Sequence, residues 1–293
     1  MLDDIWNGEA LLLEELPTRG PTAFSKFIEI LRDNGFGSKA DEILRAEASE
    51  YIISQNQRGY CIIINNEVCH KPDEDDIFQY AHDIEAKALD IALSTIGYSS
   101  PEFKRNLCPR DLISVLTEFS QKDFSKADSC IVIILSNGAR KMNSNFIFDI
   151  NGECIVLNEI LNLFTDSKCP SLKYKPKIFL LPSFDGSYNF SNSVNSLKSV
   201  KLLPDVNDIF IWHFPPPKAY NLFFEELNQV KFFGQVLSKN LEHDFLECDF
   251  EKVMNNAYNE FFGKFSVERD LHSISACTKI GNVKEKITFS ITS

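Results

Sequence analysis

Apolar runs and helical patterns alternate along most of the chain. Continuous apolar runs at residues 59–66, 129–136, 176–182 and 209–214 are bounded by turn residues, which predicts buried strands. Stretches with apolar residues at helical spacing lie between and after these runs. Strands that alternate with helices are typical of a mostly parallel sheet with helices on both faces. We therefore expect a three-layer α/β/α sandwich.

Several helices follow from apolar residues spaced three or four positions apart. They are carried by Ile84, Ala88, Ile91 and Ala92; by Leu112, Val115, Leu116 and Phe119; by Leu157, Ile160, Leu161 and Phe164; by Phe233, Val236, Leu237 and Leu241; and by Phe250, Val253, Met254, Ala257, Tyr258 and Phe261. Asp249 is placed to cap the last helix. The partly alternating segment 284–291 predicts an edge strand, and the Ser- and Asn-rich segment 186–207 predicts a linker.

Residues 1–46 predict a separate helical module. Phe24, Phe27, Ile28 and Leu31 form one helical stripe, and a second helix begins near Ala40 after the break at residues 35–37. A few short helices bury little apolar area, so we expect this segment to pack on the main domain rather than to fold alone.

Composition limits the function classes. The 293 residues are 44% hydrophobic with 25 Phe, enough for a large core, and the net charge of −12 provides no basic stripe for nucleic acid. The acidic start MLDDIWNGEA lacks the basic region of a signal peptide, and no apolar run approaches the ~20 residues of a membrane span. Eight scattered Cys without a C-x-x-C pair indicate reduced thiols, so we expect a cytoplasmic protein without metal or cofactor.

Four strings, in the same order as in the family, resemble the caspases, the cysteine proteases of apoptosis. They are GYCIIINN (59–66), SKADSCIVIILSNG (125–138), KPKIFLLPSFDG (175–186) and LPDVNDIFI (203–211). The resemblance implies a caspase-like fold with a large-subunit region at 50–186, a linker at 187–207 and a small-subunit region at 208–293. The linker has no Asp between Gly186 and Pro204, so we expect the chain to remain uncut.

The N-terminal segment carries a second resemblance. LLLEELPTRGPTAFSKFIEILRDNGF (11–36) is similar to the second half of a caspase recruitment domain (CARD), the helical module of initiator caspases. Residues 1–46 would then be a partial, truncated CARD.

The resemblance implies that the catalytic pair is missing. The position of the family's nucleophilic Cys falls on Phe184, and that of its His falls on Asn137. A benzyl group cannot attack a carbonyl, and an Asn side chain cannot titrate near pH 7. Of the loops that surround the oxyanion, only Gly138 and Gly186 are retained.

The family's pocket for an Asp side chain is also changed at the aligned positions. Its first Arg position falls on Ile77, its Gln position on Pro182 and its second Arg position near Phe223. A carboxylate in such a pocket would find no cation to offset its desolvation.

Two readings of other residues remain open. Another Cys could serve as nucleophile, although Cys61 and Cys130 lie in predicted core strands, where Cys is usually inert. His213 is expected to be a packed strand residue rather than a ligand.

We therefore expect a non-catalytic caspase homologue that regulates apoptosis by binding an active initiator caspase, or itself, through its last strand. Val283, Ile287 and Phe289 are the candidate residues of that dimer edge. One alternative is an adaptor that binds a CARD-containing partner through the N-terminal helices. Another is a weak Asp-specific cysteine endopeptidase.

Overall fold

The chain forms two compact units, 1–48 and 49–293. The computed structural model describes residues 22–66, 81–99, 101–141, 143–184, 200–215, 232–262 and 277–290. Among these residues, no helix is both long and apolar enough to cross a membrane.

The first unit contains the helices α2 (Ala23–Asp33) and α3 (Gly37–Glu47), as the apolar spacing predicts. Gly35 allows the sharp turn between them because its φ is +83°, a left-handed value that most side chains disfavour. Ile28 and Ala40 are the buried apolar residues of the two helices. The relation of this unit to a recruitment domain stays a prediction.

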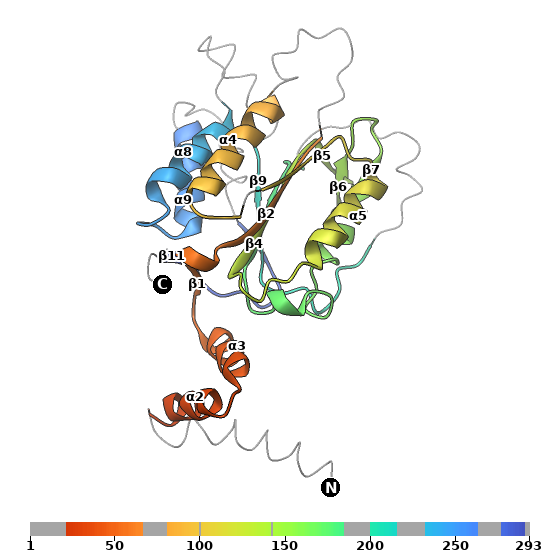
Figure 1. Ribbon diagram of the computed structural model, residues 1–293. Coiled ribbons are helices and arrows are strands. Elements are labelled where there is room, and N and C mark those ends of the chain that lie inside the picture. Colours follow the sequence, from red (N-terminus) through yellow and green to blue (C-terminus); the bar gives the residue numbers. More distant parts are fainter. Residues whose placement is uncertain are drawn as a thin grey trace. The chain divides into compact units, whose positions relative to one another are not determined.

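A six-stranded sheet is the centre of the second unit (Figure 1). Its order is β10 (Thr278–Ile280), β9 (Ile209–His213), β8 (Lys177–Leu181), β4 (Ser129–Leu135), β2 (Gly59–Asn65) and β3 (Glu102–Arg105). Neighbouring strands are parallel except for β10, which runs antiparallel to β9. The four predicted strands are therefore confirmed, and they form the middle of the sheet.

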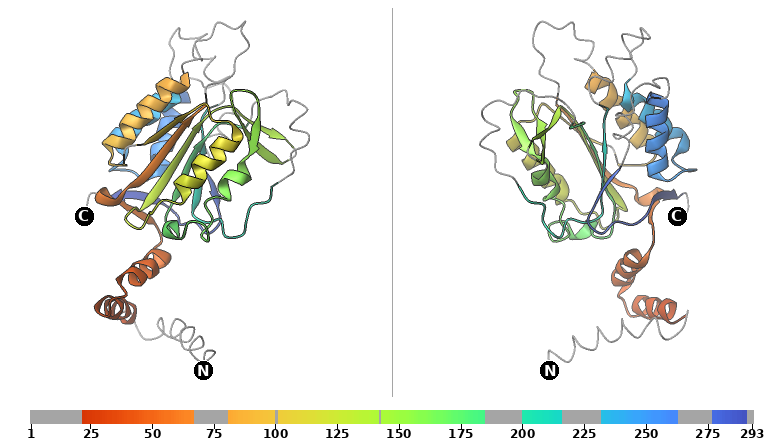
Figure 2. Two further views of the ribbon diagram at one scale, coloured as in Figure 1. Left: turned by 45° about the vertical axis from the view of Figure 1, so that its right-hand side comes forward. Right: turned by 180° about the vertical axis from the view of Figure 1, so that it is seen from behind.

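Helices cover both faces of this sheet (Figures 1 and 2). One face carries α4 (Ala81–Thr95), α8 (Phe233–Asp244) and α9 (Phe250–Phe262), and the other carries α5 (Pro109–Ser120) and α6 (Leu157–Leu161). Each face has its own apolar core, since alternate residues of a strand point to opposite sides. The α/β/α sandwich is confirmed, and so is the N-cap of α9, where the Lys252 amide donates to Asp249 Oδ1 at 2.8 Å.

The helix α4 forms as predicted, but most of its predicted buried stripe is wrong. Ile84 and Ile91 are exposed, whereas Ala86, Leu89 and Ala92 lie in the core. The helix packs against α8 as well as the sheet, and this contact rotates its buried face. The Gly234 amide of α8 donates to the buried carboxylate of Glu85 at 3.0 Å.

Apart from β11 (Ile287–Ser290), the strands outside the four apolar runs were not predicted. They are β3 and β10, the strand β1 (Tyr51–Ser54), and a small antiparallel sheet of β5 (Gly138–Lys141), β6 (Ser144–Phe148) and β7 (Cys154–Val156). The structure also contains the short 3-10 helices η2 (Gln55–Gln57) and η4 (Pro170–Leu172).

The predicted dimer edge lies outside the six-stranded sheet, and its role in dimerisation stays a prediction. The last described strand, β11 (Ile287–Ser290), pairs in parallel with β1 in a separate two-stranded sheet. Ile287 and Phe289 are buried in the core, and Val283 packs against it. These residues are therefore not an edge of the six-stranded sheet, whose antiparallel end is β10. The alternation along β11 reflects an inner face that meets Phe245 and Phe250.

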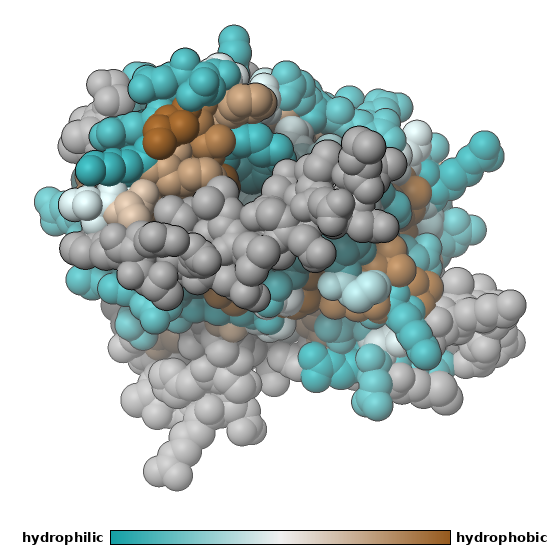
Figure 3. Space-filling model, turned by 90° about the horizontal axis from the view of Figure 1, so that it is seen from below, coloured by the Kyte–Doolittle hydropathy of each residue, from teal (hydrophilic) through white to brown (hydrophobic). Residues whose placement is uncertain are grey.

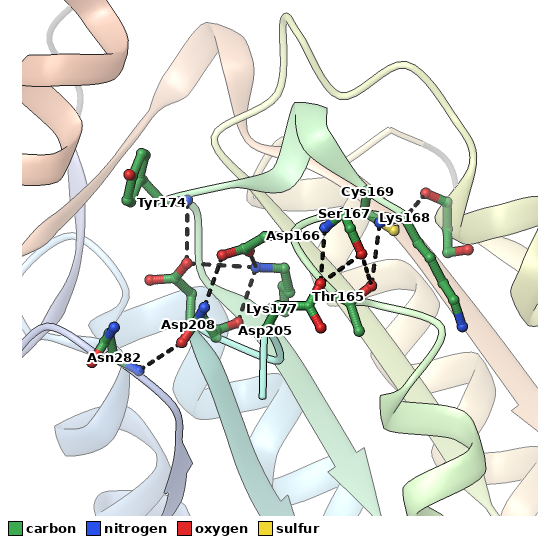
Figure 4. A network of polar contacts seen from close by, with 12 residues as sticks. Thr165, Asp166, Ser167, Lys168, Cys169, Tyr174, Lys177, Asp205, Asp208 and Asn282 are labelled. Carbon is green, nitrogen blue, oxygen red and sulfur yellow. Dashed lines mark hydrogen bonds and ion pairs between the residues drawn. The ribbon is translucent and has the colours of Figure 1, made fainter. Parts of the chain in front are cut away.

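A buried polar network joins distant segments at the amino ends of β8 and β9 (Figure 4). The fully buried Lys177 Nζ lies 3.6 Å from Asp208 Oδ2 and 3.7 Å from Asp166 Oδ1, and it donates to the Asn207 carbonyl at 3.0 Å. The Tyr51 hydroxyl of β1 donates to Asp208 Oδ1 at 2.5 Å. These contacts connect the start of β8 to β1 and to the segment just before β9.

Some large apolar side chains of the described residues reach the surface. Figure 3 shows one face of the molecule, on which hydrophobic atoms gather in separate patches among hydrophilic ones. The exposed large apolar residues among those described are Ile30, Phe36, Leu44, Ile52, Ile84, Ile91, Phe103, Leu203 and Leu246.

Candidate functional site

The candidate site lies where β4 and β8 end. These parallel strands pair Cys130 with Lys177 and Ile133 with Leu180, a constant offset of 47 residues. The same offset, continued past the strands, aligns Asn137 with Phe184. Carboxyl ends of adjacent parallel strands are where open α/β sheets build their sites. The two candidate catalytic positions, though far apart in sequence, therefore come from neighbouring strand ends.

The Phe184 side chain occupies this position. It is only 5% exposed and belongs to the apolar core on the α5 side of the sheet. A Cβ placed on Gly138 would lie 2.8 Å from Phe184 Cδ1 and 2.5 Å from the Ser183 carbonyl oxygen. Gly138 is thus required for packing, because any side chain there would collide with the backbone beside Phe184.

His213 completes the site from the third strand end. It is the last residue of β9 and pairs with Leu181 of β8. Its ring meets the Phe184 ring edge to face, with centroids 5.2 Å apart. Its Nδ1 lies 3.1 Å from the Pro182 carbonyl oxygen. The expectation of a packed His agrees with these contacts, but its place in the site was missed.

A strand-end signal for His213 was present in the sequence. Asn137 and Phe184 each follow a buried strand, and His213 closes another one just before Phe214. Its backbone carbonyl accepts a hydrogen bond from the Tyr258 hydroxyl of α9, which ties the strand end to the helix layer.

Asn137 takes part through its backbone. Its carbonyl accepts a hydrogen bond from the Phe148 amide at 3.0 Å, and the Ser136 hydroxyl donates to the Phe148 carbonyl. These bonds fix the end of β4 against β6. The side chain of Asn137 is half-buried and is not a titrating base.

The remaining predicted site residues divide into two groups. Pro182 is described and lies directly after β8, beside His213. Ile77, Gly186 and Phe223 lie outside the described residues.

Five of the described thiols are less acidic than a free Cys side chain. Burial raises the pKa of Cys61 and of Cys169, and it raises the pKa of Cys130 to about 12. Burial is the main cause, and nearby carboxylates the second, of a pKa raised to about 11 for Cys154 and to about 12 for Cys277. Because the thiolate is the nucleophile, none of these five Cys is activated for attack.

The string KPK (175–177) before the site has a structural role. Lys175 and Lys177 are both buried, and Lys175 Nζ donates to the Phe124 carbonyl at 2.6 Å. Among the described residues, no three His, Cys, Asp or Glu side chains are grouped to hold a metal ion. The described part of the site therefore offers packed aromatic rings and backbone amides, with no activated nucleophile.

Comparison with known proteins identifies relatives of this chain. The family model described as "Caspase domain" matches residues 58–258. The chain is 31% identical to caspase-9 of Homo sapiens over 158 residues, which cover 52% of this chain and 37% of that protein. It is 29% identical to caspase-8 of Mus musculus and 27% identical to caspase-3 of Bos taurus. These two matches cover 53% and 52% of this chain, and 32% and 52% of the relatives.

Proposed function

We propose that this chain, which belongs to the caspase family, regulates caspase-dependent proteolysis without hydrolysing peptides itself. The observation that carries the proposal is the buried Phe184 ring, which fills the strand end between Gly138 and His213. In the family pattern that strand end presents the nucleophilic thiol.

The chemistry of the two positions supports this assignment. Acyl transfer by a Cys protease needs a thiolate and a base that holds and returns its proton. Phe184 supplies no lone pair, and Asn137 supplies no titrating nitrogen. Because the two groups act as a unit, their combined loss removes on the order of 10⁴-fold or more in rate.

The proposed partner is an active initiator caspase. The strand β10 closes one end of the six-stranded sheet, and among the described residues no strand pairs with its outer side. Open strand edges are templates for pairing with another chain. We place the regulatory contact at β10, in place of the segment 284–291 that the sequence favoured.

A second candidate function rests on the first unit. Ile30 on α2, Leu44 on α3 and Phe36 just before α3 are exposed, and apolar residues of this kind suit an adaptor for another helical module. Under that reading the caspase-like unit would not be needed for binding. A weak Asp-specific protease is the third candidate, and it is disfavoured by the Phe184 ring.

The test is a titration of the purified chain into the active initiator caspase of its own organism. Cleavage of an Asp-containing fluorogenic peptide is followed, with this chain alone as the blank. We expect a saturable change in rate, whose direction distinguishes an activator from a decoy. A flat titration would contradict regulation through a caspase partner.

Two variants separate the candidate surfaces. Deletion of residues 1–48 removes the first unit and leaves β1, which belongs to the second unit. Thr278→Lys adds a charge to the β10 edge, which blocks strand pairing. We expect the deletion to retain the effect and Thr278→Lys to abolish it, whereas an adaptor would show the reverse.

A further inference from the structure

The strand β3 forms the other end of the six-stranded sheet. It pairs with β2 on one side, and among the described residues no strand pairs with its outer side. It is the segment Glu102–Arg105, preceded by Pro101. Phe103 is 39% exposed, which is high for a large aromatic residue in a strand.

The backbone of β3 directs alternate residues outward. The Asn106 amide donates to the Asn65 carbonyl of β2 at 3.0 Å. In a parallel pair, every second residue of a strand turns both its N–H and its C=O toward the neighbouring strand. Counting back from Asn106 in steps of two, Lys104 and Glu102 turn these groups toward β2. Phe103 therefore turns its amide and carbonyl groups away from β2, toward the outer side of the sheet.

The side chains divide between the two faces of the sheet. Phe103 lies beside Ile63, which faces α4, and Glu102 and Lys104 lie beside Ile62 and Ile64 on the α5 face. Consistent with this, Lys122 Nζ after α5 lies 2.5 Å from Glu102 Oε1.

We propose that β3 is a self-association edge that pairs in antiparallel fashion with β3 of a second copy of this chain. A two-fold axis perpendicular to the sheet keeps each side chain on its own face, so only residues of the same parity can oppose each other. With Phe103 opposite its own copy, the outward amide and carbonyl of each Phe103 bond to the other.

In this register the charges are complementary. Glu102 of each chain lies opposite Lys104 of the other, on the same face of the sheet, so two opposite-charge pairs flank the axis. On the other face, Arg105 lies over the Phe103 ring of its own chain at 5.0 Å, and this pair would flank the ring of the second copy. Among the described residues, Lys104 has no ion pair within its own chain.

The association is expected to be weak and concentration-dependent. The strand is short, and Pro101 cannot donate an amide to the outer rung opposite Arg105. An interface of this size lies at the low end for specific association unless neighbouring surfaces add to it. The inference does not depend on the proposed regulation, because the caspase partner was assigned to β10 at the opposite edge.

The test is sedimentation velocity of the full chain over a dilution series. We expect the wild-type chain to populate dimers as concentration rises. Lys104→Glu places two acidic pairs across the axis, and Glu102→Lys places two basic pairs there. Each variant should weaken self-association about tenfold.

Mixing the two variants provides the decisive arm. A chain with two acids opposite a chain with two lysines restores both attractive pairs, so the mixture should form heterodimers that neither variant forms alone. Thr278→Lys at β10 is the matched control and should leave this restoration unchanged. A wild-type chain that stays monomeric, charge variants without effect, or a mixture that stays monomeric would each overturn the inference.

Glu102→Lys also removes the pair with Lys122 and could lower stability. Phe103→Cys gives a second readout, because the two-fold register brings the two introduced thiols together. A disulfide-linked dimer in Phe103→Cys, absent from Arg105→Cys, supports the register. Equal cross-linking of both variants, or none, would contradict it.

Discussion

Phe184 and Gly138 depend on each other in this structure. The ring is 5% exposed and lies so near Gly138 that an added Cβ would meet it at 2.8 Å. Its other neighbour is the His213 ring. Phe184, which the resemblance aligns with the family's nucleophile, is part of the apolar core, and its removal should affect stability.

Phe184→Ala should lower the free energy of unfolding by about 3 kcal/mol, because a buried ring is removed and a cavity is left. Urea denaturation followed by fluorescence measures this. The control is Phe103→Ala, whose ring is 39% exposed and whose effect should stay within about 0.5 kcal/mol. Equal, small effects of both substitutions would contradict the packing role of Phe184.

Lys177 is the cation of the buried network, and its loss should be costly. Burial raises the pKa of Asp208, and the nearby Lys177 offsets part of that rise. Lys177→Met leaves this carboxylate and Asp166 without the ammonium group, so we expect a loss of about 3–5 kcal/mol at neutral pH.

The deficit of Lys177→Met should shrink as pH falls. A carboxyl group whose pKa is raised by folding binds its proton more tightly in the folded state, so its ionised form costs stability above that pKa and the cost disappears below it. Unfolding free energies at neutral and mildly acidic pH measure the change. Lys239→Met, in an exposed pair with Glu260 at 3.5 Å, should differ little at either pH. A pH-independent deficit would contradict this assignment.

At the scale of elements, sequence patterns located the central strands well and the helix faces less well. The runs that became β2, β4, β8 and β9 are apolar on both faces, so no choice of face was required. For α4, two apolar stripes were present, and spacing alone could not decide between them. The contact with α8, which arises from distant sequence, decided it.

The helix α4 provides a direct test of this reading. Leu89→Ala should lower the free energy of unfolding by about 2–5 kcal/mol, because Leu89 is fully buried in the apolar core. Ile91→Ala, two residues along the same helix, should change it by about 0.5 kcal/mol or less, since Ile91 is 55% exposed. Chemical denaturation of the two variants measures both. The reverse order would restore the stripe that the sequence favoured.

The short strands could not be predicted from the sequence for a different reason. The strands β1, β3 and β10 have three or four residues each, and they become strands only because a neighbouring strand, distant in the sequence, supplies hydrogen bonds. The segment around β11 was recognised as a strand, but its partner β1 was not. The sequence therefore did not show that this strand belongs to a separate two-stranded sheet.

At the scale of the whole molecule, the site was predictable through the order of the strands. Asn137 and Phe184 follow separate apolar runs, and adjacent parallel strands bring them together. The sequence placed His213 at the end of an apolar run, but its contact with Phe184 was not predictable, because that contact depends on β9 lying next to β8 and on the direction of two rings. Gly186, Ile77 and Phe223 remain predictions from the resemblance.

The central claim is that the chain does not hydrolyse peptides. It is tested most directly by measuring turnover of an Asp-containing fluorogenic peptide by the purified chain alone, before and after alkylation of its thiols. The account predicts a rate equal to that of buffer in both samples, because Phe184 occupies the strand end where a thiol is needed. A rate above buffer that disappears on alkylation would contradict it and would assign catalysis to one of the eight Cys.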